Sequence, residues 1–220
     1  MKENLKVVSD WYTTEKSYEY MPEATKNGLK IWEKCVISKY FSQDSHILDI
    51  GCGMGREAFA LYDLGFKVTG VDISRPIITK AKQLAIESKR TIEFILTDGL
   101  YIPFENDIFD IIIIWSQTFG LFYGEENQIH ILQECKRVLK KGGILSFSGH
   151  DREFQQTNYA RSLNGNKFYA YINTDCYWES FTIDEILERV KKVGFDSTTC
   201  ERGLNYKEED GTILHCECIK

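Results

Sequence analysis

The sequence lacks any apolar run long enough to cross a membrane, which takes about 20 consecutive apolar residues in a helix. Behind Met1 the chain is polar and aromatic, without the apolar core that a secretory signal needs. These two absences argue against a membrane protein and against a secreted protein. They predict a cytoplasmic location and no membrane partner.

Positive charge is also in short supply. The chain has 27 Lys and Arg against 33 Asp and Glu, which gives a formal net charge of −6. No tract of basic residues stands out, and binding to nucleic acid requires a basic surface. The sequence therefore predicts no nucleic-acid partner. Its 43% hydrophobic and 27% charged residues are ordinary for a folded chain.

The seven cysteines form no Cys-x-x-Cys pair and no Cys/His cluster with the spacing of a zinc site. Cys216 and Cys218 lie two residues apart, so on a strand they would share one face without bonding to each other. We expect no metal site. We expect the cysteines to be small core residues in a reducing compartment.

Short apolar runs alternate with helical patterns along most of the 220 residues. Four consecutive isoleucines, Ile111–Ile114, indicate a strand buried on both faces, which is typical of the centre of a parallel sheet. The alternation predicts an α/β fold with a doubly wound, mostly parallel sheet of seven strands, helices on both faces and a C-terminal antiparallel hairpin. The expected strands are His46–Ile50, Lys67–Asp72, Ile92–Thr97, Phe109–Trp115, Gly143–Ser148, Ser197–Glu201 and Thr212–Ile219.

Helix signals lie between these strands. Ser74 precedes a helix with Pro76 in its first turn, and a second helix is expected over Glu125–Leu139. Thr182 and Glu185 form a capping box for a third helix, which Gly194 should end. The whole chain, 1–220, is predicted to be a single domain. Two segments depart from the alternation of strands and helices: an N-terminal helical part, 1–45, and a polar, aromatic insertion, 150–181.

A glycine-rich loop follows the first strand. Gly51, Gly53 and Gly55 occupy alternate positions before a helix that begins near Arg56, so a ligand is expected at the carboxyl end of this strand. Asp49 precedes the loop and would repel a pyrophosphate but suits an ammonium group. Asp72 ends the second strand, where an acid can accept hydrogen bonds from both hydroxyls of a ribose. Arg56 stands where a dinucleotide loop would have its third glycine.

With these features the sequence resembles the class I methyltransferases that depend on S-adenosylmethionine (SAM). The resemblance spans roughly residues 45–150 and continues more weakly to the C-terminus. It is carried by five motifs in order: Asp49–Gly55, Val71–Ser74, Leu96–Gly99, Pro103-Phe104 with Phe109–Ile114, and Arg137–Gly143.

The resemblance implies SAM as the cofactor and assigns roles along its binding site. The methionine part would lie on the glycine loop, with Asp49 attracting its ammonium and Asp72 holding the ribose. Ile73 would pack on the adenine face. The remaining contacts would come from Cys52 in the loop, Asp98 and Gly99 at the adenine edge, the turn Trp115, Ser116 and Gln117 near the sulfonium, and Tyr20 of the N-terminal segment.

Each assignment has a simpler alternative. Asp49 could merely cap the loop, Asp72 could serve the N-terminus of the following helix, and Asp98 could be a turn residue. Trp115 fits a core aromatic residue better than a ligand contact. Arg56 fits a solvated helix residue better than a partner for carboxylates.

Methyl transfer from a sulfonium is an in-line displacement, so the protein mainly aligns the reactants and excludes water. The sequence shows no catalytic triad. His150, after the fifth strand, is the candidate base if the acceptor needs one. We expect residues 1–45 to form a lid and residues 150–181 the acceptor side, in a monomer or homodimer that methylates a small molecule. A non-catalytic SAM-binding protein and an NAD-dependent oxidoreductase on a related fold stay open as alternatives.

Overall fold

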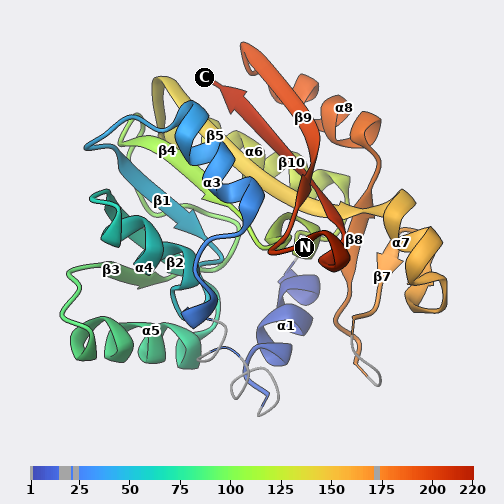
Figure 1. Ribbon diagram of the computed structural model, residues 1–220, viewed down its shortest axis with the longest axis horizontal. Coiled ribbons are helices and arrows are strands. Elements are labelled where there is room, and N and C mark those ends of the chain that lie inside the picture. Colours follow the sequence, from blue (N-terminus) through green and yellow to red (C-terminus); the bar gives the residue numbers. More distant parts are fainter. Residues whose placement is uncertain (1, 15–20, 22–24, 171–173) are drawn as a thin grey trace.

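The computed structural model describes residues 2–14, 21, 25–170 and 174–220, and Figure 1 shows their arrangement. The main sheet has the strand order β3-β2-β1-β4-β5-β10-β9. The first five of these strands run parallel, and β10 is antiparallel to both β5 and β9. The strands are β1 (His46–Ile50), β2 (Lys67–Asp72), β3 (Glu93–Leu96), β4 (Phe109–Ile114), β5 (Leu139–Asp151), β9 (Ser197–Leu204) and β10 (Thr212–Ile219).

This sheet confirms the predicted fold class and the C-terminal hairpin. Three further short strands, which were not predicted, continue it from β5, so the described residues form a sheet of ten strands and not seven. Another difference is β5, which is longer than the predicted Gly143–Ser148. It begins directly after α6 (Glu125–Val138), and its last two residues pair with a further strand, β8 (Trp178–Phe181). Partner strands beyond both predicted ends therefore extend β5, and the local sequence does not show them.

Helices cover both faces of the sheet, and each face has its own apolar core. On one face α3 (Ile31–Tyr40), α4 (Arg56–Asp63) and α5 (Arg75–Glu87) pack against Ile111 and Ile113. On the other face α6 and α8 (Ile183–Val193) pack against Ile112 and Ile114. Figure 1 shows α3 in front of the sheet and α6 behind it. The isoleucine run is thus buried on both sides, as predicted.

Several predicted helix signals are also confirmed. Thr182 Oγ1 accepts a hydrogen bond from the backbone N–H of Glu185, and the Glu185 carboxylate accepts one from the N–H of Thr182. Gly194 ends α8 in a left-handed conformation, at a φ of 76°. Ser74 stands at the N-cap of α5, although its side chain makes no capping bond there.

The remaining elements lie outside the main sheet. The N-terminal segment contributes α1 (Lys2–Trp11) and a 3₁₀ turn, η1 (Thr25–Asn27). The segment after β5 forms α7 and a short hairpin that joins β8. These smaller elements are η2 (Thr118–Leu121), α7 (Arg152–Asn158), η3 (Ala160–Ser162), β6 (Leu163–Asn164), β7 (Lys167–Phe168) and η4 (Glu208–Asp210). No helix among the described residues has the length and apolar character needed to cross a membrane.

The expectation for the cysteines is only partly right. Cys52, Cys135 and Cys218 are buried, as core residues should be. Cys200 and Cys216, however, face each other across β9 and β10 and form a disulfide. Sixteen residues separate them in the sequence, and only the register of the hairpin brings them together.

Candidate active site

The glycine loop turns sharply at the carboxyl end of β1. Gly51, Gly53 and Gly55 have φ values of 72°, 54° and 99°, in the region that residues with a Cβ rarely adopt. The loop is tied to the end of β2, because the N–H groups of Gly51 and Cys52 both donate to the carbonyl of Val71, at 2.8 and 3.1 Å. The predicted loop therefore sits beside the end of the second strand, where Asp72 lies.

Asp72 connects the loop with the start of α5. Its Oδ2 accepts from the N–H of Gly53 at 3.1 Å, and its Oδ1 accepts from the N–H of Ser74 at 2.9 Å. Burial raises the pKa of the Asp72 carboxyl, and these backbone donors oppose the rise. Asp72 thus does serve the start of the helix, and each carboxylate oxygen keeps a further lone pair for a ligand.

A cavity of about 550 Å³ opens beside these residues. It has the size of a small-molecule site. Its wall includes most of the loop, the end of β2 and the turn after β4. The predicted residues that line it are Gly51, Cys52, Gly53, Asp72, Ile73, Gly99 and Ser116.

The N-terminal segment supplies another part of the wall. Leu5, Val8, Trp11 and Tyr12 of α1 and the residues after it line the cavity, together with Trp178 of β8. Tyr20 of this segment was predicted near the ligand, whereas the apolar residues of α1 were not. Tyr20 lies outside the described residues.

Other predicted residues lie behind the wall. Asp98 accepts from the N–H groups of Leu100 and Tyr101 at 3.0 and 2.8 Å, as a turn aspartate does. Trp115 is 1% exposed, and its indole N–H donates to Ser146 Oγ at 2.8 Å. Asp98, Trp115, Gly55 and Gln117 do not line the cavity.

Asp49 is also buried behind the loop, with an exposure of 2%. Its Oδ2 has no hydrogen-bond partner in the described part of the protein. Burial raises the pKa of Asp49 well above its usual range, and the nearby Glu57 raises it further. Both effects favour the neutral form of the carboxyl.

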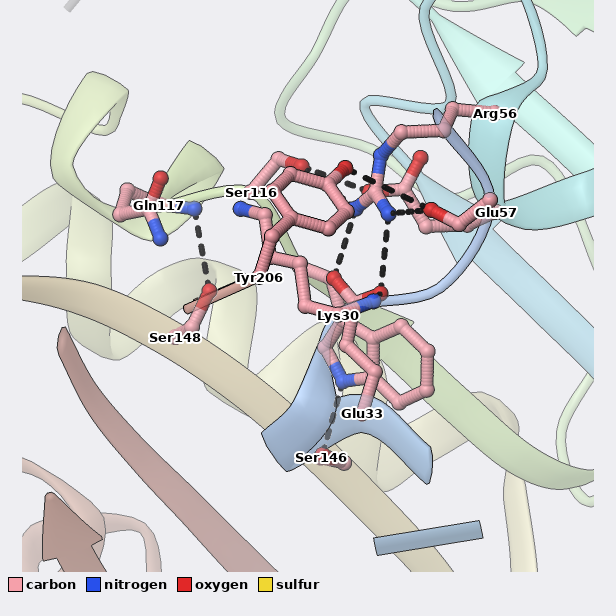
Figure 2. A network of polar contacts seen from close by, with 11 residues as sticks. Lys30, Glu33, Arg56, Glu57, Ser116, Gln117, Ser146, Ser148 and Tyr206 are labelled. Atoms are coloured by element: carbon pink, nitrogen blue, oxygen red, sulfur yellow. Dashed lines mark hydrogen bonds and ion pairs between the residues drawn. The ribbon is translucent and has the colours of Figure 1, made fainter. Parts of the chain in front are cut away.

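Arg56 corrects the expectation of a solvated residue, because it is 9% exposed and lies at the centre of a polar network (Figure 2). Its Nη1 donates to the Gly28 carbonyl at 2.6 Å and to Glu33 Oε2 at 2.9 Å. Its Nη2 donates to Glu33 Oε1 at 2.6 Å, to Ser116 Oγ at 2.9 Å and to Glu57. Burial raises the pKa of Glu57, but Arg56 and the Ser116 hydroxyl outweigh it, so the pKa of Glu57 ends below its usual value.

The turn after β4 has an unusual backbone. Ser116 and Gln117 have φ values of 51° and 59°, in the left-handed region that is costly for residues other than glycine. Ser116 Oγ donates to Glu57 at 2.7 Å, and the N–H of Gln117 donates to Ser148 Oγ at 3.0 Å. Side chains from α4 and β5 thus hold the turn in place.

His150 lies on β5, outside the residues that line the cavity. Its ring packs against Phe168 and Trp178, with centroids 4.9 and 6.2 Å away, and Trp178 lines the cavity. Burial, with a contribution from Lys30, lowers the pKa of His150 to about 3. The imidazole is neutral at pH 7 but a weak base, and its role as a general base stays a prediction.

Known proteins match both the sequence and this geometry. A family model described as a methyltransferase domain matches residues 47–143. A protein named as a methyltransferase, YqeM of Bacillus subtilis (strain 168), is 27% identical over 201 residues, or 84% of this chain and 77% of the relative. An uncharacterized protein of Methanocaldococcus jannaschii is 30% identical over 164 residues, which cover 74% of this chain and 70% of the relative.

These matches place the chain among the methyltransferases, and its fold is that of the SAM-dependent class. A solved SAM-dependent methyltransferase from Methanosarcina mazei has the same fold, with a TM-score of 0.69 and 23% identity over 84% of this chain and 95% of that one. A solved protein from Pyrococcus horikoshii also superposes with a TM-score of 0.69, at 20% identity over 96% of this chain and 99% of that one. For this methyltransferase, these matches support SAM as the cofactor.

The network around Arg56 is the part of the candidate site that the sequence did not reveal. Arg56 and Glu57 also line the cavity, but Glu33 joins them from α3. The one local signal was two adjacent charged residues at the start of a helix that is otherwise apolar on its buried face. That signal does not predict that Arg56 contacts Glu33, 23 residues earlier, or Ser116, 60 residues later.

Proposed function

We propose that SAM lies in the cavity with its methionine part along the glycine loop and its ribose on Asp72. The support is geometric: the loop, the Asp72 carboxylate, Ile73 and Gly99 form one continuous wall. A Cβ on Gly99 would come within 2.5 Å of Ile73 Cγ2, so glycine leaves room there for Ile73 to lie against a flat ring. Bound there, SAM would supply an electrophilic methyl group, and this chain's residues would orient it and exclude water.

The Asp72→Ala variant tests this placement. It removes the charged acceptor for both ribose hydroxyls, which should weaken SAM binding by about 1–3 kcal/mol. Calorimetric titration with SAM measures the change. Asp63→Ala, which removes an exposed acid at the end of α4, is the matched control and should bind SAM like the wild type. Equal SAM affinity in both variants would remove Asp72 from the donor site.

We further propose that the methyl acceptor is a small molecule held between α1 and β8. The observation that carries this proposal is the wall opposite the glycine loop, where Val8, Trp11 and Leu121 face the same cavity as Trp178. The N-terminal segment would act as the lid and the segment 150–181 as the acceptor side. The net charge of −6 supports a small molecule over a nucleic acid.

A screen for SAM consumption tests the acceptor class. Purified protein, SAM with a labelled methyl group and fractionated cell extract would be incubated together, and products would be identified by mass spectrometry. We expect label in a compound of low molecular mass. Label found in protein or RNA, or SAM binding without transfer to any fraction, would contradict the proposal.

A further inference from the structure

Arg56 connects parts of the cavity wall that lie far apart in the sequence. It binds Gly28 and Glu33 of the N-terminal segment, and it also binds Ser116 in the turn after β4. Thr25, three residues before Gly28, lines the cavity, as do Arg56 and Ser116 themselves. One buried guanidinium therefore holds the N-terminal wall and the β4 turn together, as Figure 2 shows.

The β4 turn needs such support. Ser116 and Gln117 are consecutive residues in the left-handed region, and backbone of this kind persists only where the surroundings hold it. The Ser116 hydroxyl accepts from Arg56 and donates to Glu57, so the ion pair fixes both the donor and the acceptor side of this group. Gln117 is held separately, through Ser148 on β5.

We propose that Arg56 is a positioning residue, which sets the Ser116–Gln117 turn against the N-terminal wall and thereby the geometry of the SAM site. The inference rests on methyl transfer in this cavity, as proposed above, but not on the nature of the acceptor. Lysine cannot replace Arg56, because its single ammonium lacks the planar fork that reaches both oxygens of Glu33 and also Ser116.

A double-mutant cycle on SAM affinity tests the coupling. Glu33→Gln and Ser116→Ala each remove one partner of Arg56, one on α3 and one in the turn after β4, and leave the guanidinium in place. We expect each single variant to weaken SAM binding roughly tenfold by calorimetry, as the loss of a charge-assisted hydrogen bond would. The double variant should lose clearly less than the product of the two single losses, since both act through one side chain.

Arg56→Lys should lose about as much SAM affinity as the double variant. Arg90→Gln is the matched control, because Arg90 pairs with Asp63 at the exposed end of the same helix and should leave SAM affinity unchanged. Unfolding temperatures of all variants show that each is folded at the temperature of the titration. If Arg56→Lys does not fold, the cycle at Glu33 and Ser116 decides alone.

Two results would overturn the proposal: losses in the double variant that multiply, or SAM affinity within twofold of the wild type in Arg56→Lys. The titrations contain no methyl acceptor. A wrong assignment of the acceptor class would therefore leave them unchanged, and the two proposals fail separately.

Discussion

Two buried acids near the glycine loop, Asp49 and Glu57, have pKa values that are shifted in opposite directions. Asp49 is deeply buried and lacks a partner for Oδ2, and its pKa lies well above the usual range. Glu57 is buried as well, but Arg56 and Ser116 stabilise its charged form, so its pKa lies below the usual value. Burial therefore favours the neutral form of Asp49, whereas Arg56 and Ser116 favour the charged form of Glu57.

The raised pKa of Asp49 predicts that the stability of the protein depends on pH. Because folding raises the pKa of Asp49, its stabilising contribution is complete below the unfolded pKa of about 3.9 and is lost as pH rises toward the folded pKa. Asp49→Asn removes that loss. The variant should gain stability relative to the wild type by up to about 1.4 kcal/mol per pH unit as pH rises from 4.

Urea unfolding of both proteins without SAM at pH 5 and pH 7 measures this difference. Asp10→Asn, which changes an exposed acid on α1, should show a difference that is nearly independent of pH. A difference for Asp49→Asn that stays constant between the two pH values would show that Asp49 is ionised in the folded protein.

At the scale of residues, the predicted positions are right where a backbone conformation or the end of a strand determines where a residue lies. The glycine loop and Asp72 lie on the cavity wall, as their place in the sequence indicated. Arg56 was wrongly expected in solvent, because its burial depends on α3, which packs over the loop from a distant part of the chain. Trp115 follows the simpler alternative, a core residue, since Ser146 on the neighbouring strand satisfies its indole.

Secondary-structure elements were predicted best where their signals are local. The bounds of β1, β2 and β10 agree with the prediction to the residue, and the capping box of α8 is formed. The limits of β5 were missed because its partners, and not its own residues, determine where pairing stops. Arg152 of α7 also binds both oxygens of Glu185, so the start of α8 is tied to the segment after β5.

The cap of α8 carries a prediction of its own. Thr182→Ala removes the acceptor for the N–H of Glu185 and should lower the free energy of unfolding by about 1 kcal/mol. Thr182→Ser keeps a hydroxyl and should stay close to the wild type. Thr79→Ala, in the exposed middle of α5, is a control for the loss of a threonine. Urea unfolding measures all three, and equal stability of the two Thr182 variants would show that the cap contributes nothing.

On the scale of the whole molecule, the cavity is assembled from segments that lie far apart in the sequence, from Leu5 to Trp178. The cavity takes its wall from α1, the glycine loop, the β4 turn and β8. A ligand that fills it must stabilise all of these parts together. SAM at 100 times its dissociation constant should therefore add about 2.7 kcal/mol to the stability.

For a chain of this size, that gain corresponds to a rise in the unfolding temperature of roughly 5–11 °C. Differential scanning calorimetry with and without SAM measures the rise, and NAD at the same concentration is the control. A shift with NAD and none with SAM would contradict the assignment of the cofactor. A shift of equal size in Asp72→Ala would show that SAM is bound elsewhere.

The sequence by itself determined the order of strands and helices, the turn at the glycines and the acid at the end of β2. These features follow from hydrophobic period and backbone conformation, which neighbouring residues fix. Only the tertiary structure decided which side chains meet: Arg56 with Glu33 and Ser116, Cys200 with Cys216, and α1 with the cavity. Such contacts depend on strand register and on the packing of distant segments, and no local pattern encodes either.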